Sequence, residues 1–204
     1  MQLYTHKDYS FYVGVQQKLT SIKTMQGKLK DISWINEDGI HKVNSKIHEY
    51  IPTIHTMVCH GCRCGYETEI FRKLNPDAIV FGTDVYKKAY AYNREYFRNI
   101  DFDVVPGEWI GYFDVVYSNS IDHSRDPLFN LNSWKLELKE GGVSYVTFYW
   151  GTGVSRTDCF QLDSQRWKEE IEDICDRAGM KILSISDEYM DKYLNHCADV
   201  VMGK

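Results

Sequence analysis

From Ile54 to the end of the chain, short apolar runs alternate with longer segments whose apolar residues recur at helical spacing. This alternation is typical of an α/β fold with a mostly parallel sheet. The expected strands lie at 54–59, 78–85, 112–120, 143–150, 180–186 and 196–203, with a short run at 100–105. The expected helices lie at 65–75, 86–99, 127–142 and 163–179. The third would end at Gly141 and Gly142, and the fourth would start on an Asp163 cap.

The first fifty residues do not show this alternation of strand and helix patterns as clearly. Residues 9–26 and 41–51 have helical patterns, and 31–35 form a short apolar run between them. We therefore expect residues 1–50 to form a mainly helical N-terminal cap on an α/β domain at 51–204. The expected domain is Rossmann-like, with a doubly wound, mostly parallel, seven-stranded sheet.

Composition narrows the function classes. A chain of 204 residues that is 43% hydrophobic can bury one self-sufficient core. A net charge of -5 makes nucleic acid an unlikely partner, because nucleic-acid affinity comes largely from neutralising phosphates. The first residues of the chain do not have the pattern of a secretory signal. We therefore expect the six cysteines to be reduced thiols and the protein to be cytoplasmic. No apolar run is long enough to cross a membrane.

Three of the cysteines crowd into the turn "CHGCRCG", at Cys59, Cys62 and Cys64. With His55 or His60 they could supply the four soft ligands of a zinc ion. Structural zinc usually takes two pairs of ligands from separate knuckles, and the other cysteines are dispersed along the chain. We therefore expect no metal here.

A second interpretation makes the same turn a cofactor loop. Such a loop needs a strand, a glycine turn, a helix, and an acid at the end of the next strand that accepts hydrogen bonds from a ribose. Gly61 and Gly65 supply the turn, and Asp84 lies 19 residues after Gly65. Asp84 could instead cap the following helix. Arg63 stands where a dinucleotide fingerprint has a glycine, which disfavours a nicotinamide oxidoreductase.

Two segments carry a family resemblance. "HGCRCGYE" at 60–67 and "YSNSIDHSRDP" at 117–127 resemble the "HGTRxGxE" and "YSNSxDHxxDP" motifs of some small proteins among the class I S-adenosylmethionine-dependent methyltransferases. The resemblance covers roughly residues 51–150. The chain departs from the usual first motif of the class at Cys59, which takes the place of an acid, and at Arg63.

The resemblance implies S-adenosyl-L-methionine as the cofactor and assigns parts of it to residues. The turn would surround the methionine portion, Asp84 would hold the ribose, and Phe102 would lie against the adenine, whose amine would meet Asp101 or Asp103. Arg63 would bind the cofactor carboxylate or pair with Glu67. The implied cofactor-binding residues are Gly61, Cys62, Arg63, Gly65, Glu67, Asp84, Val85, Asp101, Phe102, Asp103, Ser118, Asn119 and Ser120.

The substrate side of the site is predicted from titratable and aromatic residues. His123 is the expected general base, with Asp122 orienting it, although Asp122 and Asp126 could instead cap the next helix while His123 packs against the loop. The expected substrate contacts are Asn119, His123, Tyr149 and Trp150, with Tyr9, Phe11 and Tyr12 of the cap also near the opening. These aromatic residues could instead belong to the core.

The sequence thus predicts a methyltransferase whose acceptor is a small molecule or a glycan. No stretch resembling "NPPY" follows the fourth expected strand, which disfavours a DNA base-amine methyltransferase. The alternative is a catalytically inactive module with the same fold, because the first motif departs from the usual pattern.

Overall fold

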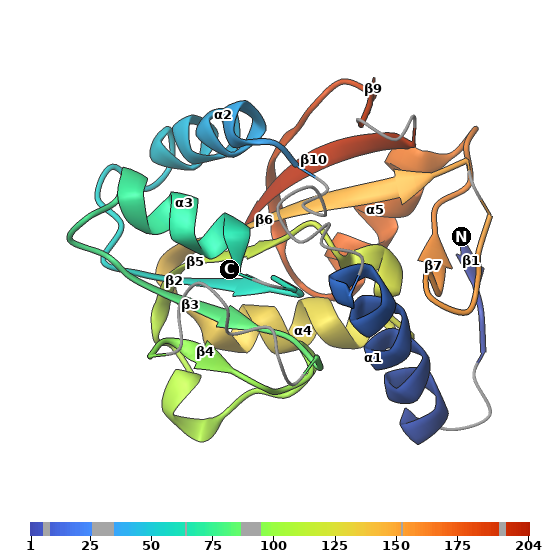
Figure 1. The fold of residues 1–204 in the computed structure, drawn as a ribbon. Helices are drawn as coiled ribbons and strands as arrows, with labels where there is room; N and C mark the ends of the chain where they lie inside the picture. The colour runs from blue at the N-terminus through green and yellow to red at the C-terminus, as the bar shows by residue number, and fades with distance from the viewer. Residues whose placement is uncertain (6–8, 26–34, 64, 87–94, 152, 192–194) are drawn as a thin grey trace.

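A computed structural model describes residues 1–5, 9–25, 35–63, 65–86, 95–151, 153–191 and 195–204. A central sheet with helices on both faces dominates the fold (Figure 1). The expectations for 31–34, for Cys64 and for most of the helix at 86–99 lie outside the described residues.

The described part of the sheet confirms the predicted Rossmann-like class, with eight strands instead of seven. Its order is β4-β3-β2-β5-β6-β10-β8, and β9 pairs with β10. The first five strands of this order are parallel, whereas β10 runs antiparallel to both of its long neighbours. The strands are β2 (Thr56–His60), β3 (Ile79–Thr83), β4 (Phe97–Arg98), β5 (Phe113–Ser118), β6 (Leu138–Trp150), β8 (Lys181–Ile185), β9 (Tyr189–Met190) and β10 (His196–Gly203).

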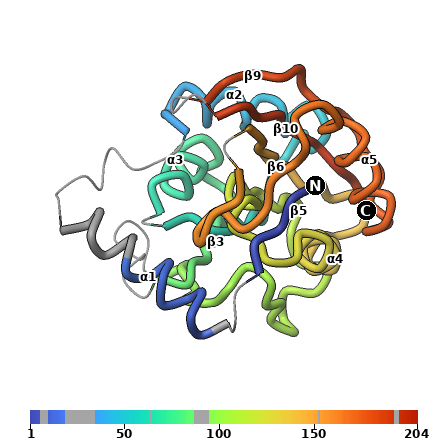
Figure 2. Tube along the Cα trace, turned by 90° about the vertical axis from the view of Figure 1, so that its right-hand side faces the viewer, coloured from blue at the N-terminus to red at the C-terminus, as the bar shows by residue number. Residues whose placement is uncertain are grey.

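Helices cover the two faces in separate layers (Figures 1 and 2). One layer holds α2 (Glu37–His48) and α3 (Tyr66–Leu74), and the opposite layer holds α4 (Pro127–Glu137) and α5 (Trp167–Arg177). The first helix, α1 (Tyr9–Met25), lies beyond the carboxyl ends of the strands. Two single-turn helices, η2 (Gly107–Trp109) and η3 (Ile121–His123), lie in loops, and β1 (Gln2–Leu3) pairs with β7 (Phe160–Gln161).

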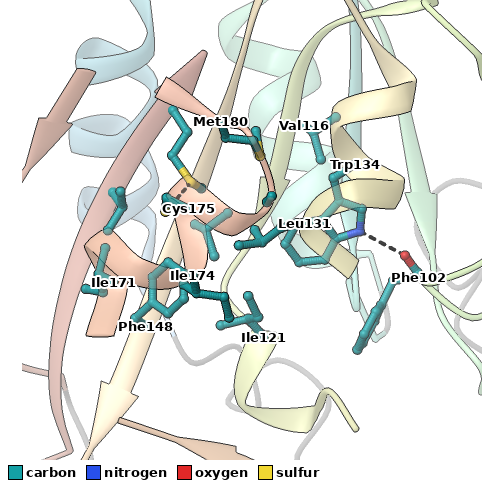
Figure 3. Close-up of a cluster of buried hydrophobic side chains, with 14 of the residues drawn as sticks. Phe102, Val116, Ile121, Leu131, Trp134, Phe148, Ile171, Ile174, Cys175 and Met180 are labelled. Carbon is teal, nitrogen blue, oxygen red and sulfur yellow. Dashed lines mark hydrogen bonds between the residues drawn. The ribbon is translucent and has the colours of Figure 1, made fainter. Parts of the chain in front are cut away.

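Strand side chains alternate between two hydrophobic clusters because successive residues of a strand point to opposite faces. In β5, Val115 and Tyr117 pack under α2 and α3, while Val116 packs against α4 and α5. Figure 3 shows the second cluster, in which the fully buried Trp134 of α4 donates a hydrogen bond from Nε1 to the Phe102 carbonyl at 2.8 Å. The core therefore fixes the loop that carries Phe102.

Several predicted helix boundaries are wrong, and the helix expected at 41–51 runs from Glu37 to His48. The helix expected at 127–142 ends at Glu137, and Gly142 lies within β6, where an added Cβ would meet the Phe113 carbonyl oxygen at 3.0 Å. The glycine pair thus permits close approach to β5 instead of ending a helix. The side chain of Asp163 accepts from the Gln165 N–H in a separate turn, and α5 starts later, at Trp167. The helix expected at 86–99 would include Phe97 and Arg98, but these two residues form the extended strand β4.

The five described cysteines are free thiols: Cys59, Cys62, Cys159, Cys175 and Cys197. Among the helices that the structure describes, none has the length and apolar character that crossing a membrane requires.

Candidate functional site

The carboxyl ends of β2, β3 and β5 meet where the strand order reverses, which is the usual ligand-binding edge of such a sheet. In the turn after β2, where Cys64 is outside the description, three described residues have positive φ: Gly61 at 69°, Arg63 at 50° and Gly65 at 81°. At Gly61 an added Cβ would lie 2.6 Å from the Ser120 Cβ, so a side chain there would collide with the loop after β5. Glycine therefore lets the two loops touch.

Asp84 follows β3 and faces this turn. Its Oδ2 accepts from the Arg63 N–H at 2.8 Å, and its Oδ1 accepts from the Tyr86 N–H at 2.7 Å. Burial raises the pKa of Asp84, while these two N–H groups favour the ionised form and oppose that shift. Each carboxylate oxygen has two lone pairs, so both keep acceptor capacity for a further donor. The contact with Tyr86, two residues along the chain, is that of an Asx turn, and most of the helix that Asp84 could instead cap lies outside the described residues.

A small cavity of about 40 Å³ lies between these groups. Its walls include Gly61, Arg63, Asp84, Val85, Phe102 and His123. A larger cavity of about 350 Å³ shares Phe102 and His123 with it and adds Asp101 and Asp103 to its walls. Most of the predicted cofactor residues thus gather in one continuous region of the surface.

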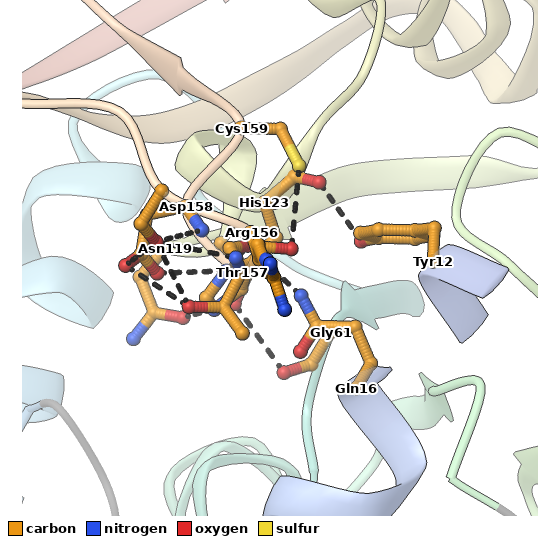
Figure 4. A network of polar contacts seen from close by, with 11 residues as sticks. Tyr12, Gln16, Gly61, Asn119, His123, Arg156, Thr157, Asp158 and Cys159 are labelled. Atoms are coloured by element: carbon orange, nitrogen blue, oxygen red, sulfur yellow. Dashed lines mark hydrogen bonds and ion pairs between the residues drawn. The ribbon is translucent and has the colours of Figure 1, made fainter. Parts of the chain in front are cut away.

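Helix α1 covers this region and is tied to it by hydrogen bonds to backbone carbonyls. The Tyr12 hydroxyl donates to the His123 carbonyl at 2.8 Å, Gln16 Nε2 donates to the Thr157 carbonyl at 2.9 Å, and Gln17 Nε2 donates to the Val85 carbonyl at 3.0 Å. Figure 4 shows the first two contacts beside Gly61. Of the cap aromatics, Tyr12 lines both cavities, Phe11 is exposed, and the side chain of Tyr9 is outside the description.

The loop after β5 forms the opposite wall. Asn119 Nδ2 donates to the buried Glu67 Oε1 at 3.0 Å, and Ser120 Oγ donates to Asn119 Oδ1 at 3.2 Å. Ser118 Oγ donates to the His60 carbonyl at 3.3 Å. These bonds hold the predicted loop residues against the turn. Cys62 is buried on the other side of the turn, with its sulfur toward Gly82 of β3.

His123 lies between two carboxylates. Its Nδ1 contacts the Thr157 carbonyl at 2.7 Å and Asp158 Oδ1 at 3.3 Å. Burial would lower the pKa of His123, but Asp122, Asp158 and the Thr157 carbonyl together raise it to about 9. Burial raises the pKa of Asp158, but its contacts with His123, Ser155 and Thr157 lower it to about 2.

The part of the chain that the structure describes brings one group of potential metal ligands together, at His123. One oxygen each from Asp122 and Asp158 and one nitrogen from His123 lie within 4.8 Å of one another. In the cysteine-rich turn, by contrast, both ring nitrogens of His60 already have partners, Thr83 Oγ1 at 2.8 Å and Glu137 Oε2 at 2.8 Å. That buried ring also stacks on Trp134, so a zinc ion there would have to break a core contact.

Tyr149 and Trp150 point to opposite faces of β6. Tyr149 lines a third cavity of about 460 Å³ together with Asn119. Trp150 is 1% exposed and stacks on Trp167 at 4.7 Å, in the cluster under α5. The structure therefore does not bring Trp150 to the site, and the core alternative describes it better.

The sequence interpretation missed several residues of the site. Gln16, Thr157 and Asp158 reach it through contacts that span more than thirty residues, and no local motif marks them. Asp199 also lines the third cavity. One feature of the sequence could have identified Asp199, because it is the single acid in the mostly apolar run of β10.

No protein-family model matches the sequence, and no curated protein sequence matches it either. Solved structures do match. A Burkholderia thailandensis 1,6-didemethyltoxoflavin-N1-methyltransferase, solved with 1,6-didemethyltoxoflavin and S-adenosylhomocysteine, is 12% identical with a TM-score of 0.74 over 98% of this chain and 92% of that one. An S-adenosylmethionine-dependent methyltransferase from Clostridium acetobutylicum is 13% identical with a TM-score of 0.65, over 91% of this chain and 98% of that one.

The [4+2]-cyclase SpnF is also similar, at 14% identity and a TM-score of 0.64 over 82% of this chain and 81% of that one. One fold thus carries both methyltransferases and a cyclase, and function depends on the site. The comparisons establish that this chain has the fold of the S-adenosylmethionine-dependent methyltransferases.

Proposed function

We propose that the protein is an S-adenosylmethionine-dependent methyltransferase that acts on a small molecule. The observation that carries this proposal is the placement of the Gly61 turn against the Asp84 carboxylate at the carboxyl ends of β2 and β3, beside neighbouring cavities of about 40 and 350 Å³. The matching methyltransferase structures support it, since one of them contains S-adenosylhomocysteine with its acceptor and another contains S-adenosyl-L-methionine.

The residues present fit this cofactor. Gly61 provides a close backbone approach that a Cβ would block, and Asp84 has spare acceptor capacity for two ribose hydroxyls. Phe102 and Val85 supply apolar surface for an adenine, and Arg63 supplies a cation for the cofactor carboxylate. Helix α1 would then cover the bound cofactor, which is the role we propose for residues 1–50.

The cofactor supplies a methyl group on a positively charged sulfur. The protein's part is to align the acceptor with that methyl group and to keep water out, and alignment alone can provide most of the acceleration. His123 suits the role of general base poorly, because a pKa of about 9 keeps it protonated at neutral pH. We instead assign it the role of a fixed positive charge between the two cavities that it lines.

Transfer of radioactive methyl groups tests the proposal. The protein is incubated with S-adenosylmethionine labelled on the methyl group and with a small-molecule extract of the source cells. We expect label in a small molecule with the wild type and a loss of at least tenfold with Asp84→Asn. Asp77→Asn is the matched control, because Asp77 is exposed before the opposite end of β3. If cofactor binds but no label moves, the inactive module or another reaction is the better account.

A further inference from the structure

The third cavity is a groove on the face of the sheet that α2 partly covers. It has a volume of about 460 Å³, and its floor and walls include Asn119, Tyr145, Thr147, Tyr149, Tyr189 and Asp199. We call it the β6–β10 groove. Asn119 belongs to the loop that contacts the Gly61 turn through Ser120, so one end of the groove is formed by the residue next to the one that makes that turn contact.

The strand register places three of these residues in a row. Ser118 pairs with Val146, so Asn119 lies beside Thr147 on the next strand, and Thr147 pairs with Asp199 on β10. Neighbouring strands are about 4.8 Å apart, so Asp199 lies about 10 Å from Asn119 across the sheet. A small molecule of ordinary size can span that distance.

The polar groups around Asp199 offer acceptors to a ligand. Thr147 Oγ1 donates to Asp199 Oδ1 at 2.7 Å, and the Tyr189 hydroxyl donates to the same oxygen at 2.9 Å. Because each hydroxyl has one proton, both now offer only lone pairs to a ligand. Asn119 also uses an amide hydrogen on Glu67. A ligand that fits this wall has to supply donors.

The charge of the groove favours a cation. Among the described residues that line it, two are acids, Asp191 and Asp199, and one is a lysine, Lys42. Burial raises the pKa of Asp199, and only neutral hydroxyls of Thr147, Tyr145 and Tyr189 oppose that shift. Within the part of the chain that the structure describes, no cationic side chain pairs with this carboxylate. Tyrosine rings on both sides are also favourable neighbours for an ammonium group.

We infer that the methyl acceptor is an amine-bearing small molecule that lies in the β6–β10 groove, with its ammonium group on Asp199 and another part beside Asn119. The inference rests on the proposed function, because the bound amine is a methyl acceptor only if the protein is a methyltransferase. The groove's preference for an amine can be measured without the cofactor.

The test uses three fragments that carry a cationic, a neutral and an anionic group on the same fluorophenyl ring: 4-fluorobenzylamine, 4-fluorobenzyl alcohol and 4-fluorobenzoate. Fluorine NMR line broadening reports binding of each fragment to the full chain. We expect the amine to bind at least tenfold more tightly than the alcohol or the benzoate. Asp199→Asn should remove that preference, whereas Asp173→Asn on the exposed face of α5 should retain it.

The wild-type comparison keeps the inference testable if Asp199→Asn fails to fold. Equal binding of the amine and the alcohol, or tighter binding of the benzoate through Lys42, would overturn it. A separate titration with S-adenosylhomocysteine distinguishes the two proposals. If that ligand binds but the amine is not preferred, only the groove assignment fails. If the amine is preferred but S-adenosylhomocysteine does not bind, the proposed function fails.

Discussion

The role that we propose for His123 differs from the one that its sequence motif predicts. An isolated histidine titrates near neutrality and is the natural choice for a general base. Here the carboxylates of Asp122 and Asp158 outweigh the effect of burial and raise the pKa to about 9. Asp158 lies 35 positions away in the sequence, so this shift could not be predicted from the motif.

The raised pKa of His123 predicts a pH dependence of stability. Protonation favours the folded state, so its contribution is complete below about pH 6.5 and is lost as the pH rises through about 9. The free energy of unfolding should fall by at most about 3 kcal/mol over that window, relative to His123→Gln. Urea unfolding at several pH values measures this, with the exposed His55→Gln as control. Parallel curves for wild type and His123→Gln would contradict the assigned pKa.

Tyr117 offers a second prediction at the residue scale. Its ring packs in the core under α2 and α3, while its buried hydroxyl has no hydrogen-bond partner among the described residues. A buried unpaired hydroxyl costs about 1–3 kcal/mol, so Tyr117→Phe should leave the free energy of unfolding unchanged or raise it.

The matched control for Tyr117 is Tyr12→Phe. Tyr12 is also buried, but its hydroxyl donates to the His123 carbonyl, so this change should cost about 1 kcal/mol. Denaturant unfolding compares the two variants. A loss with Tyr117→Phe as large as that with Tyr12→Phe would show that the Tyr117 hydroxyl does have a partner.

The residues that the sequence identifies well are those with a local constraint. Gly61 and Gly65 were expected from the turn that they form, and Asp84 from its place after a strand. Trp150 was misplaced because its neighbour Tyr149 points to the other face of the strand, and the sequence does not say which face meets the site.

At the scale of elements, α1 is joined to the site by side chains that bond to backbone carbonyls. If α1 covers a bound cofactor, removing those bonds should speed its release. Each neutral hydrogen bond contributes about 1 kcal/mol, so Gln16→Ala with Gln17→Ala should raise the dissociation rate of S-adenosylhomocysteine by about tenfold or more. Stopped-flow displacement measures the rate. The exposed Gln165→Ala is the control, and an unchanged rate in the double variant would contradict the covering role.

Helix α4 connects the core to the loop of Phe102. Trp134 is fully buried, stacks on His60 and bonds to the Phe102 carbonyl. Trp134→Ala should therefore lower the free energy of unfolding by about 3–5 kcal/mol. Leu136 on the same helix is 52% exposed, so Leu136→Ala should cost less than about 1 kcal/mol. Denaturant unfolding gives both values, and similar losses for the two variants would contradict this account of the core.

Element type was easier to predict than element ends. The parallel strands β2, β3 and β5 were expected because their apolar runs suit a sheet covered on both faces. The end of α4 was missed because "GG" after a helical pattern usually marks a helix end. Here the close approach of Gly142 to the β5 backbone, a tertiary contact, is what requires the glycine.

At the scale of the molecule, the two hydrophobic clusters hold a sheet whose carboxyl edge carries the polar loops. The fold class could be predicted because strand and helix patterns alternate along the chain. The β6–β10 groove could not, because it combines α2, β6, β9 and β10, which are distant in sequence.

Calorimetric titration with S-adenosylhomocysteine tests the central claim most directly. We predict one molecule bound per chain, with an affinity at least tenfold weaker in Asp84→Asn and unchanged in Asp77→Asn, because only Asp84 faces the Gly61 turn. Absence of measurable heat for the wild type at millimolar ligand, or equal affinity in Asp84→Asn, would contradict a cofactor site at the ends of β2 and β3.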